Sequence, residues 1–288
     1  MAHERVPEAE EHLDTAIPVL DHGFVRLVDY MGGDARVVQS ARVSYGAGTK
    51  TYREDRGLIR YLLRNEHTSP FEQVILTFHT KMPIFVARQW VRHRTARLNE
   101  ISGRYSILPN EFYVPHGQAI APQSDDNKQG RAATAFDPAE AQSIAQRLAK
   151  TQTDVYEHYQ GLIDQGVARE LARINLPLST YTEWYWQIDL HNLMHFLKLR
   201  MDTHAQFEIR EYAKALNQLA RAVAPICMEA FDDFVLSGVR LSGAEVSAVA
   251  DLVQRTDPEL WSEVMQHAQL SKRERELLTT KLARGQKK

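Results

Sequence analysis

This 288-residue sequence has a single cysteine, no long apolar run and no marked excess of charge of either sign. Its one cysteine, Cys227, excludes an intramolecular disulfide and favours a reducing compartment. No apolar run reaches the roughly 18 residues of a membrane span, and the N-terminus carries no apolar signal region, so we expect a cytoplasmic protein without a membrane partner. Lys and Arg number 35 against 37 Asp and Glu, which predicts no nucleic-acid partner and confines any anion site to a local cluster.

Residues that build a folded core are present in ordinary amounts, with 43% hydrophobic and 9% aromatic residues. A chain of this length buries roughly three quarters of its unfolded surface, enough for a core without disulfides or metal. Alternating apolar residues predict strands, and a period near 3.6 predicts a larger number of helices. The predicted strands are 23–31, 74–80 and 181–188. The predicted helices are 34–43, 53–65, 84–94, 137–163, 169–175, 190–201, 204–236, 244–268 and 272–283.

These patterns predict an α+β fold in which helices dominate and the sheet is small and mainly antiparallel. Residues 1–18 are too polar to pack and are predicted to form a flexible arm. Residues 19–237 are expected to form one domain, and residues 238–288 a helical C-terminal extension. Within the domain, residues 116–136 are rich in Gly, Gln, Asp, Asn and Ser, which predicts a polar surface insertion.

The densest polar segment runs from residue 89 to residue 105. On the predicted helix Gln89, Arg92 and His93 fall at positions i, i+3 and i+4, so they share one face. Four arginines lie between residues 92 and 104. Guanidinium forks bind phosphate bidentately, and a phosphate ester of charge about −1.5 to −2 calls for at least two of them. The same residues would also suit the C-terminus of a helix, and composition alone does not separate the two interpretations.

The string RHRTARLNEISGRY at 92–105 resembles the signature of the flavin-dependent thymidylate synthase family. The resemblance extends over residues 21–235 outside the polar insertion, through strings such as HTSPFE, ARINLPL and NLMHFLKLRMDTHAQFEIREYA. It implies a methyltransferase that converts dUMP to dTMP in de novo dTMP biosynthesis. Methylenetetrahydrofolate would donate the carbon, and NADPH would reduce a bound FAD that supplies the hydride. It also implies a homotetramer with active sites shared between subunits.

The same resemblance implies roles for individual residues. Arg200 would be catalytic, its charge stabilising the pyrimidine as carbon C5 attacks the one-carbon unit, although its position alone suggests a surface arginine. The implied dUMP contacts are Gln89, Trp90, Val91, Arg92, Glu100, Ile101, Ser102, Gly103, Arg104, Arg173 and Arg200. The implied FAD contacts are Ser69, Arg92, His93, Arg94, Glu100, Asp189, Leu190, His191 and His195. Weaker candidates near flavin or folate are Ser44, His67 and Glu72.

The sequence departs from the family pattern at a few positions: Arg97, Leu98, Asp189, His191 and His195. A metal enzyme is an alternative suggested by His191 and His195, one helical turn apart, but the string HNLMH lacks the glutamate of the zinc-protease motif, so no metal is expected. A nucleic-acid module is suggested by RHRTAR, against which the balanced charge counts. Cys227 is interpreted as an inert core thiol and Ser102 as a ligand-binding hydroxyl.

Overall fold

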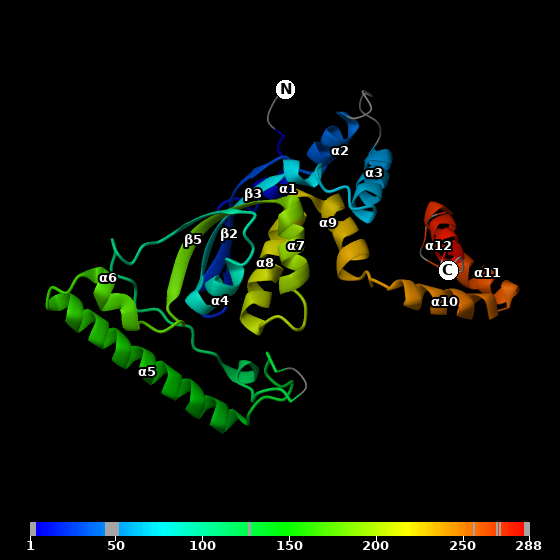
Figure 1. Ribbon diagram of the computed structural model, residues 1–288. Helices are drawn as coiled ribbons and strands as arrows, with labels where there is room; N and C mark the ends of the chain where they lie inside the picture. Colours follow the sequence, from blue (N-terminus) through cyan, green and yellow to red (C-terminus); the bar gives the residue numbers. More distant parts are fainter. Residues whose placement is uncertain are drawn as a thin grey trace. The chain divides into compact units, whose positions relative to one another are not determined.

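The computed structural model describes residues 4–43, 52–125, 128–255, 257–268, 270 and 272–284. Ser44 lies outside these described residues. The chain divides into two compact units, Met1–Leu236 and Ser237–Lys288, and each is considered by itself. The first unit contains a five-stranded sheet in the order β1-β2-β3-β5-β4, with every neighbouring pair antiparallel (Figure 1). Its strands are β1 Ala16–Val19, β2 Gly23–Met31, β3 Ile75–Pro83, β4 Arg97–Glu100 and β5 Tyr181–Asp189.

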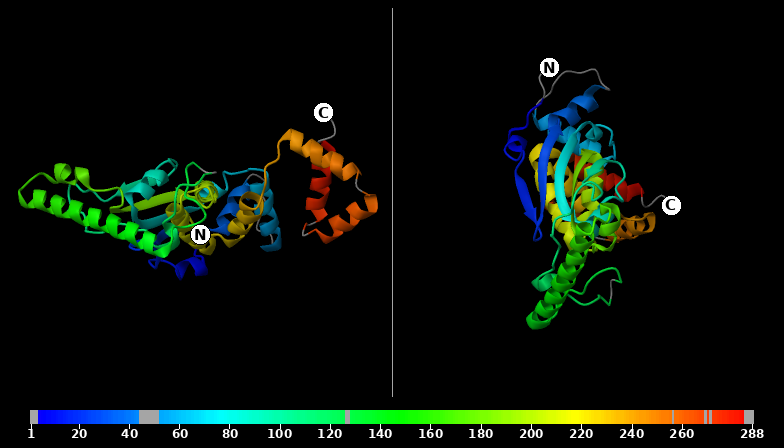
Figure 2. Two further views of the ribbon diagram at one scale, coloured as in Figure 1. Left: turned by 90° about the horizontal axis from the view of Figure 1, so that it is seen from below. Right: turned by 90° about the vertical axis from the view of Figure 1, so that its left-hand side faces the viewer.

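Helices outnumber strands in the first unit, as predicted for a helix-rich α+β fold. They are α1 Pro7–Glu10, α2 Asp34–Arg42, α3 Tyr52–Arg64, α4 Ile84–Trp90, α5 Pro138–Asp164, α6 Arg169–Ala172, α7 Leu190–Arg200, α8 Phe207–Val223 and α9 Pro225–Phe231. Short 3-10 turns occupy η2 Phe71–Gln73, η3 Gly117–Ala119 and η4 Arg173–Asn175, and a π-helical turn covers η5 Asp232–Leu236. Helices α7 and α8 lie side by side against the sheet (Figures 1 and 2).

The core lies between the sheet and helices α4, α7 and α8. Alternation along β5 buries Trp184, Trp186 and Ile188 and leaves Tyr185 44% exposed. The Trp90 indole, at the end of α4, is fully buried and meets the rings of Trp184 and Trp186 edge-on, at centroid distances of 5.5 and 5.2 Å. This aromatic cluster joins α4 to the sheet and fixes where the residues on either side of Trp90 emerge.

The sole cysteine lies in this core, near the start of α9. Cys227 is completely buried, and burial raises the pKa of its thiol. The Asp34 carboxylate accepts the backbone N–H groups of Ile226 (2.8 Å) and Cys227 (2.9 Å), which ties α2 to α9. A buried thiol with a raised pKa is a poor nucleophile, which agrees with the interpretation of Cys227 as a core residue.

The N-terminal segment differs from the predicted flexible arm. Ala9 in α1 is fully buried, and the Tyr30 hydroxyl donates to the Glu10 carboxylate and accepts the Val6 N–H (2.8 Å). Strand β1 then pairs with β2 at the edge of the sheet. Residues 4–19 therefore pack, because a few apolar side chains and one tyrosine contact outweigh their polar composition.

Several element boundaries also differ from the sequence prediction. The helix predicted over 84–94 ends at Trp90, so Gln89, Arg92 and His93 do not share a helical face. The helix predicted over 204–236 breaks before Pro225, which has no N–H to continue the ladder. Strand β4 was missed because all four of its residues are exposed and show no apolar alternation.

The second unit consists of three helices, α10 Gly243–Arg255, α11 Pro258–His267 and α12 Lys272–Arg284. The predicted single helix over 244–268 is interrupted because Asp257 caps a new helix that starts at Pro258. Helices α10 and α12 pack together, with Ala250 buried. Across both units, none of the helices within the described residues is long and apolar enough to cross a membrane.

Replacing Trp90 should destabilise the first unit severely. Trp90→Ala should lower the free energy of unfolding by about 3–5 kcal/mol, because it opens a cavity among four aromatic rings. Urea denaturation followed by far-UV circular dichroism measures this. Trp261→Ala in α11 of the separate unit is the matched control, and an equal loss in both variants would contradict the role given to Trp90.

Candidate active site

The ends of α4 and α7 are held together by the side chain of Arg200. Its Nε donates to His93 Nε2 (3.0 Å), and its Nη2 donates to the backbone carbonyl of Gln89 (3.3 Å). Residues 91–94 leave the helix in a turn in which the His93 N–H donates to the Trp90 carbonyl (3.0 Å). The structure thus brings together Arg200, His93 and Gln89, three of the residues singled out in the sequence.

His93 is kept neutral by its surroundings. Burial, with smaller contributions from the Arg200 and His195 charges, lowers its pKa to about 4. Since Nε2 accepts a hydrogen bond from Arg200, the ring proton of neutral His93 is on Nδ1. Burial also lowers the pKa of Arg200, yet a guanidinium remains charged at neutral pH. Arg200 therefore carries a full positive charge, and among the residues that the structure describes no carboxylate is hydrogen-bonded to it.

Helix α7 connects this cluster to the other flavin candidates. His195 faces His93, with ring centroids 5.8 Å apart, and is exposed. His191 is half-buried one turn earlier, and Ser69 is exposed in the turn before η2, which packs against α7. The eleven residues of α7 span about 16 Å, and His191 and His195 lie on this helix between its start and Arg200. His67 and Glu72 are also exposed near this turn, and Glu72 accepts from the Thr68 hydroxyl (3.4 Å).

Three of the candidate binding residues have side chains that stabilise the fold. Asp189 caps α7, its carboxylate accepting the N–H (2.9 Å) and the side-chain amide (2.8 Å) of Asn192. Leu190 is fully buried, and its N–H donates to the Val74 carbonyl (2.8 Å). Trp90 is equally buried in the aromatic cluster. The side chains of Leu190 and Trp90 are thus out of reach of a ligand at the surface, and motif position alone does not reveal this.

Arg92 and Arg94 supply the unpaired positive charge of the site. Both are exposed, and neither makes a hydrogen bond or ion pair with the residues that the structure describes. Val91 between α4 and these arginines packs against the core. Two exposed guanidinium groups on either side of His93 would suit a phosphorylated cofactor, which needs cationic partners.

A second cluster forms around the end of β4 and the short helix α6. Glu100 accepts the Thr182 hydroxyl (2.6 Å), and the Ile101 N–H donates to the Glu183 carbonyl (2.9 Å). A Cβ on Gly103 would lie 3.1 Å from Arg173 Cδ, so glycine lets this arginine approach the backbone closely.

Arg104 in the same cluster pairs with Glu170 through its Nε (3.0 Å), and its N–H donates to the Ser102 hydroxyl (3.3 Å). Both members of the ion pair are more than half exposed, so a ligand could replace Glu170 at small cost. Within the described parts of the chain, no hydrogen bond or ion pair joins this second cluster to Arg200, His93 and Gln89. The candidate residues therefore fall into two groups, which we call the Arg200 cluster and the Arg173 cluster.

Sequence reasoning missed one member of the Arg200 cluster. The Gln206 side chain, just before α8, accepts a hydrogen bond from the Gln89 side-chain amide. Its position in the string DTHAQFEIR gives no signal beyond the overall resemblance. As for metals, the described residues contain no group of three or more His, Cys, Asp and Glu side chains placed to hold an ion.

The fold and these clusters define a helix-rich α+β protein with an arginine-rich candidate site. The family described as thymidylate synthase complementing protein matches residues 26–226. A flavin-dependent thymidylate synthase from Treponema denticola is 62% identical over 245 residues, which are 85% of this chain and 92% of the relative. One from Treponema pallidum is 56% identical over 253 residues, 88% of this chain and 83% of the relative.

Among solved structures, a UMP/dUMP methylase PolB from Streptomyces cacaoi, bound with 5-Br dUMP, is similar with a TM-score of 0.69 and 34% identity. The match covers 77% of this chain and 100% of PolB. This chain therefore belongs to the flavin-dependent thymidylate synthase family.

The neutral state of His93 makes stability depend on pH. Below pH 6.5 the unfolded chain binds a proton at this histidine that the folded chain binds only near pH 4, so the free energy of unfolding should fall as pH decreases through this window. His93→Gln, which keeps an acceptor for Arg200, should lose less stability over the same range. Imidazole NMR titration locates the pKa directly, and a midpoint near 6.5 for His93 would contradict this assignment.

Proposed function

We propose that this protein is a flavin-dependent thymidylate synthase that methylates dUMP at uracil C5 to give dTMP. The single observation that carries the proposal is the charge of Arg200, which is held by a neutral imidazole and a backbone carbonyl and has no carboxylate partner among the described residues. The names of the relatives and the ligand of PolB support the same substrate.

The mechanism assigned to this chain is electrostatic. Arg200 stabilises the negative charge that develops on the pyrimidine ring as C5 attacks the one-carbon unit. His93 orients the guanidinium without neutralising it, because the imidazole is uncharged at neutral pH. No cysteine nucleophile takes part, since the thiol of Cys227 is buried in the core. Gln89, on α4, and Arg92, in the turn after it, bind the nucleotide on one side, with Ser102, Arg104 and Arg173 on its other side.

FAD would be held by residues of α7 together with residues of the turns next to it and of β4. Arg92 and Arg94 would hold its phosphates, while Ser69, His93, His191 and His195 would flank its rings. Glu100 would complete the set from β4. When bound, the flavin supplies the hydride, with NADPH as its reductant and methylenetetrahydrofolate as the carbon donor.

The active site is completed by a second subunit of a homotetramer. Within one chain no hydrogen bond or ion pair between described residues joins the Arg173 cluster to the Arg200 cluster. Around the Arg173 cluster, large apolar side chains are exposed to solvent: Ile101, Tyr105, Ile107, Leu171, Ile174 and Leu178. The Arg169 guanidinium donates to the Tyr105 carbonyl (2.7 Å), so the two segments that carry these side chains are adjacent. A patch of this kind is typical of a protein interface.

Flavin absorbance tests the proposed function. The purified protein should be yellow or bind added FAD, and anaerobic NADPH should bleach the flavin band faster with dUMP present. Adding methylenetetrahydrofolate should then yield dTMP, with UMP as the comparison substrate. A protein that binds no FAD and oxidises no NADPH would overturn the proposal.

Mixed oligomers test the shared active site. Arg200→Ala and Ser102→Ala should each lower kcat by about 10²-fold or more while flavin stays bound. If the two residues act in one site from different subunits, oligomers mixed by unfolding and refolding should regain part of the activity. Arg200→Ala mixed with itself is the control. Absence of recovery after mass spectrometry has verified mixing would count against sharing.

A further inference from the structure

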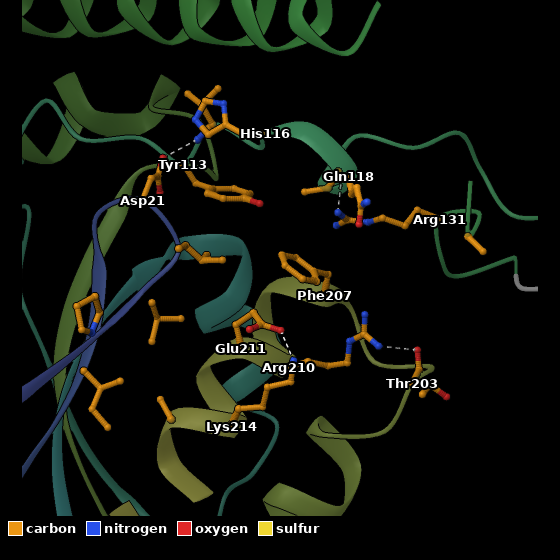
Figure 3. A pocket seen from close by; sticks show the side chains of 18 of the residues that line it. Asp21, Tyr113, His116, Gln118, Arg131, Thr203, Phe207, Arg210, Glu211 and Lys214 are labelled. Atoms are coloured by element: carbon orange, nitrogen blue, oxygen red, sulfur yellow. Dashed lines mark hydrogen bonds and ion pairs between the residues drawn. The ribbon is translucent and has the colours of Figure 1, made fainter. Parts of the chain in front are cut away.

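The described residues of the polar insertion, 116–125 and 128–136, contribute one wall of a pocket of about 1050 Å³. The other walls are the β1–β2 hairpin and the first turns of α8. Figure 3 shows Arg131 of the insertion and Tyr113 on one side of this pocket and Phe207, Arg210 and Lys214 of α8 on the other. The insertion therefore lies across this pocket from α8, the helix that follows Arg200 in the sequence.

An ion pair between half-buried Arg131 and buried Glu208 joins the insertion to α8. Arg131 Nη2 donates to both carboxylate oxygens of Glu208, at 2.7 and 2.9 Å, and the Tyr113 hydroxyl donates to the same carboxylate (3.0 Å). Glu208 is only 2% exposed, so these contacts determine where it lies. The other terminal nitrogen of Arg131, Nη1, donates to the Ala119 carbonyl. This bond links the two ends of the insertion to each other.

Cation–π contacts strengthen the same attachment at Phe207, the first residue of α8. The guanidinium carbons of Arg131 and Arg210 lie 5.7 and 6.0 Å from the centre of its ring. Arg210 also donates to the Thr203 carbonyl (3.5 Å), back toward the segment before the helix. The first turn of α8 is thus held from two sides, and the residue just before it is Gln206.

Gln206 links the start of α8 to the Arg200 cluster through a hydrogen bond with Gln89. It accepts the Gln89 side-chain amide, while the Gln89 carbonyl accepts from Arg200. The segment 201–206 joins Arg200 at one end to α8 at the other. Gln206 is exposed, so its place depends on the α8 turn that the insertion holds.

We propose that Arg131 is a positioning residue for substrate binding. By fixing Glu208 and Phe207, the insertion holds Gln206 and the segment 201–206 in place, and through them orients Gln89 and Arg200 toward dUMP. This inference rests on the proposed function, because it takes dUMP as the ligand of the Arg200 cluster. Arg131 does not touch the substrate; it acts through Gln206.

The test removes the ion pair without leaving a buried charge. Arg131→Met combined with Glu208→Gln keeps an acceptor for Tyr113, and Lys128→Met, an exposed lysine in the same insertion, is the matched control. Binding of dUMP is measured by titration calorimetry on the flavin-loaded full chain. We expect the Kd for dUMP to rise about tenfold in the double variant. Flavin content should not change, and Lys128→Met should match the wild type.

A second cycle separates positioning from general destabilisation. If Arg131 acts through Gln206, adding Gln206→Ala to the double variant should raise the Kd for dUMP little further, whereas independent effects would multiply. Multiplicative effects, or a double variant that binds dUMP as Lys128→Met does, would overturn the inference. Should the double variant fail to fold, Phe207→Leu takes its place with the same criteria. Failure of the wild type to bind dUMP would instead overturn the proposed function.

Discussion

Burial of the Trp90 indole between the sheet and α7 is the contact on which the site depends. The ring touches β5 through Trp184 and Trp186, α7 through Phe196 and α8 through Tyr212. Because one side chain binds three elements, the backbone on either side of it has little freedom. Gln89 and His93 emerge from that fixed backbone next to the end of α7, where Arg200 meets them.

Two buried or half-buried arginines in this protein show opposite uses of the same side chain. Arg131 faces a carboxylate and donates to both of its oxygens from one nitrogen, so its charge is compensated and its position is fixed. Arg200 faces a neutral imidazole and a carbonyl, which fix its geometry and leave its charge available. A carboxylate in place of His93 would orient Arg200 equally well but would reduce the stabilisation that, in the proposed mechanism, Arg200 gives to an anionic transition state. The choice of acceptor thus distinguishes a guanidinium that supports structure from one suited to act on a ligand.

Local signals predicted much of the fold. Strands β2, β3 and β5 follow from alternation, and α5 and α7 begin where Asp137 and Asp189 cap them. Strand β4 could not be predicted, because its exposed residues are held only by pairing with a strand more than 80 residues later in the sequence. The packing of the N-terminal segment could not be predicted for a similar reason, because it depends on hydrogen bonds to Tyr30, which lies in a later strand.

The sequence could indicate which residues belong to the candidate site but not how they contact one another. The resemblance singled out Arg200 and His93, yet their hydrogen bond joins residues 107 apart, which no periodicity reveals. The resemblance likewise did not show that Trp90 and Leu190 point into the core, because neighbours in a motif can have opposite orientations. Gln206 carried no chemical signature of its own and became visible only through its contact with Gln89.

The solitary, fully buried thiol of Cys227 makes the native chain a convenient background for site-specific labelling. Maleimide and nitroxide reagents react with exposed thiolates, and a buried thiol with a raised pKa offers none. A cysteine introduced on the surface, for instance in the polar insertion, would then carry the sole probe without any need to mutate the protein's own sulfur. Distances between spin labels on neighbouring copies would become measurable in an otherwise unaltered protein.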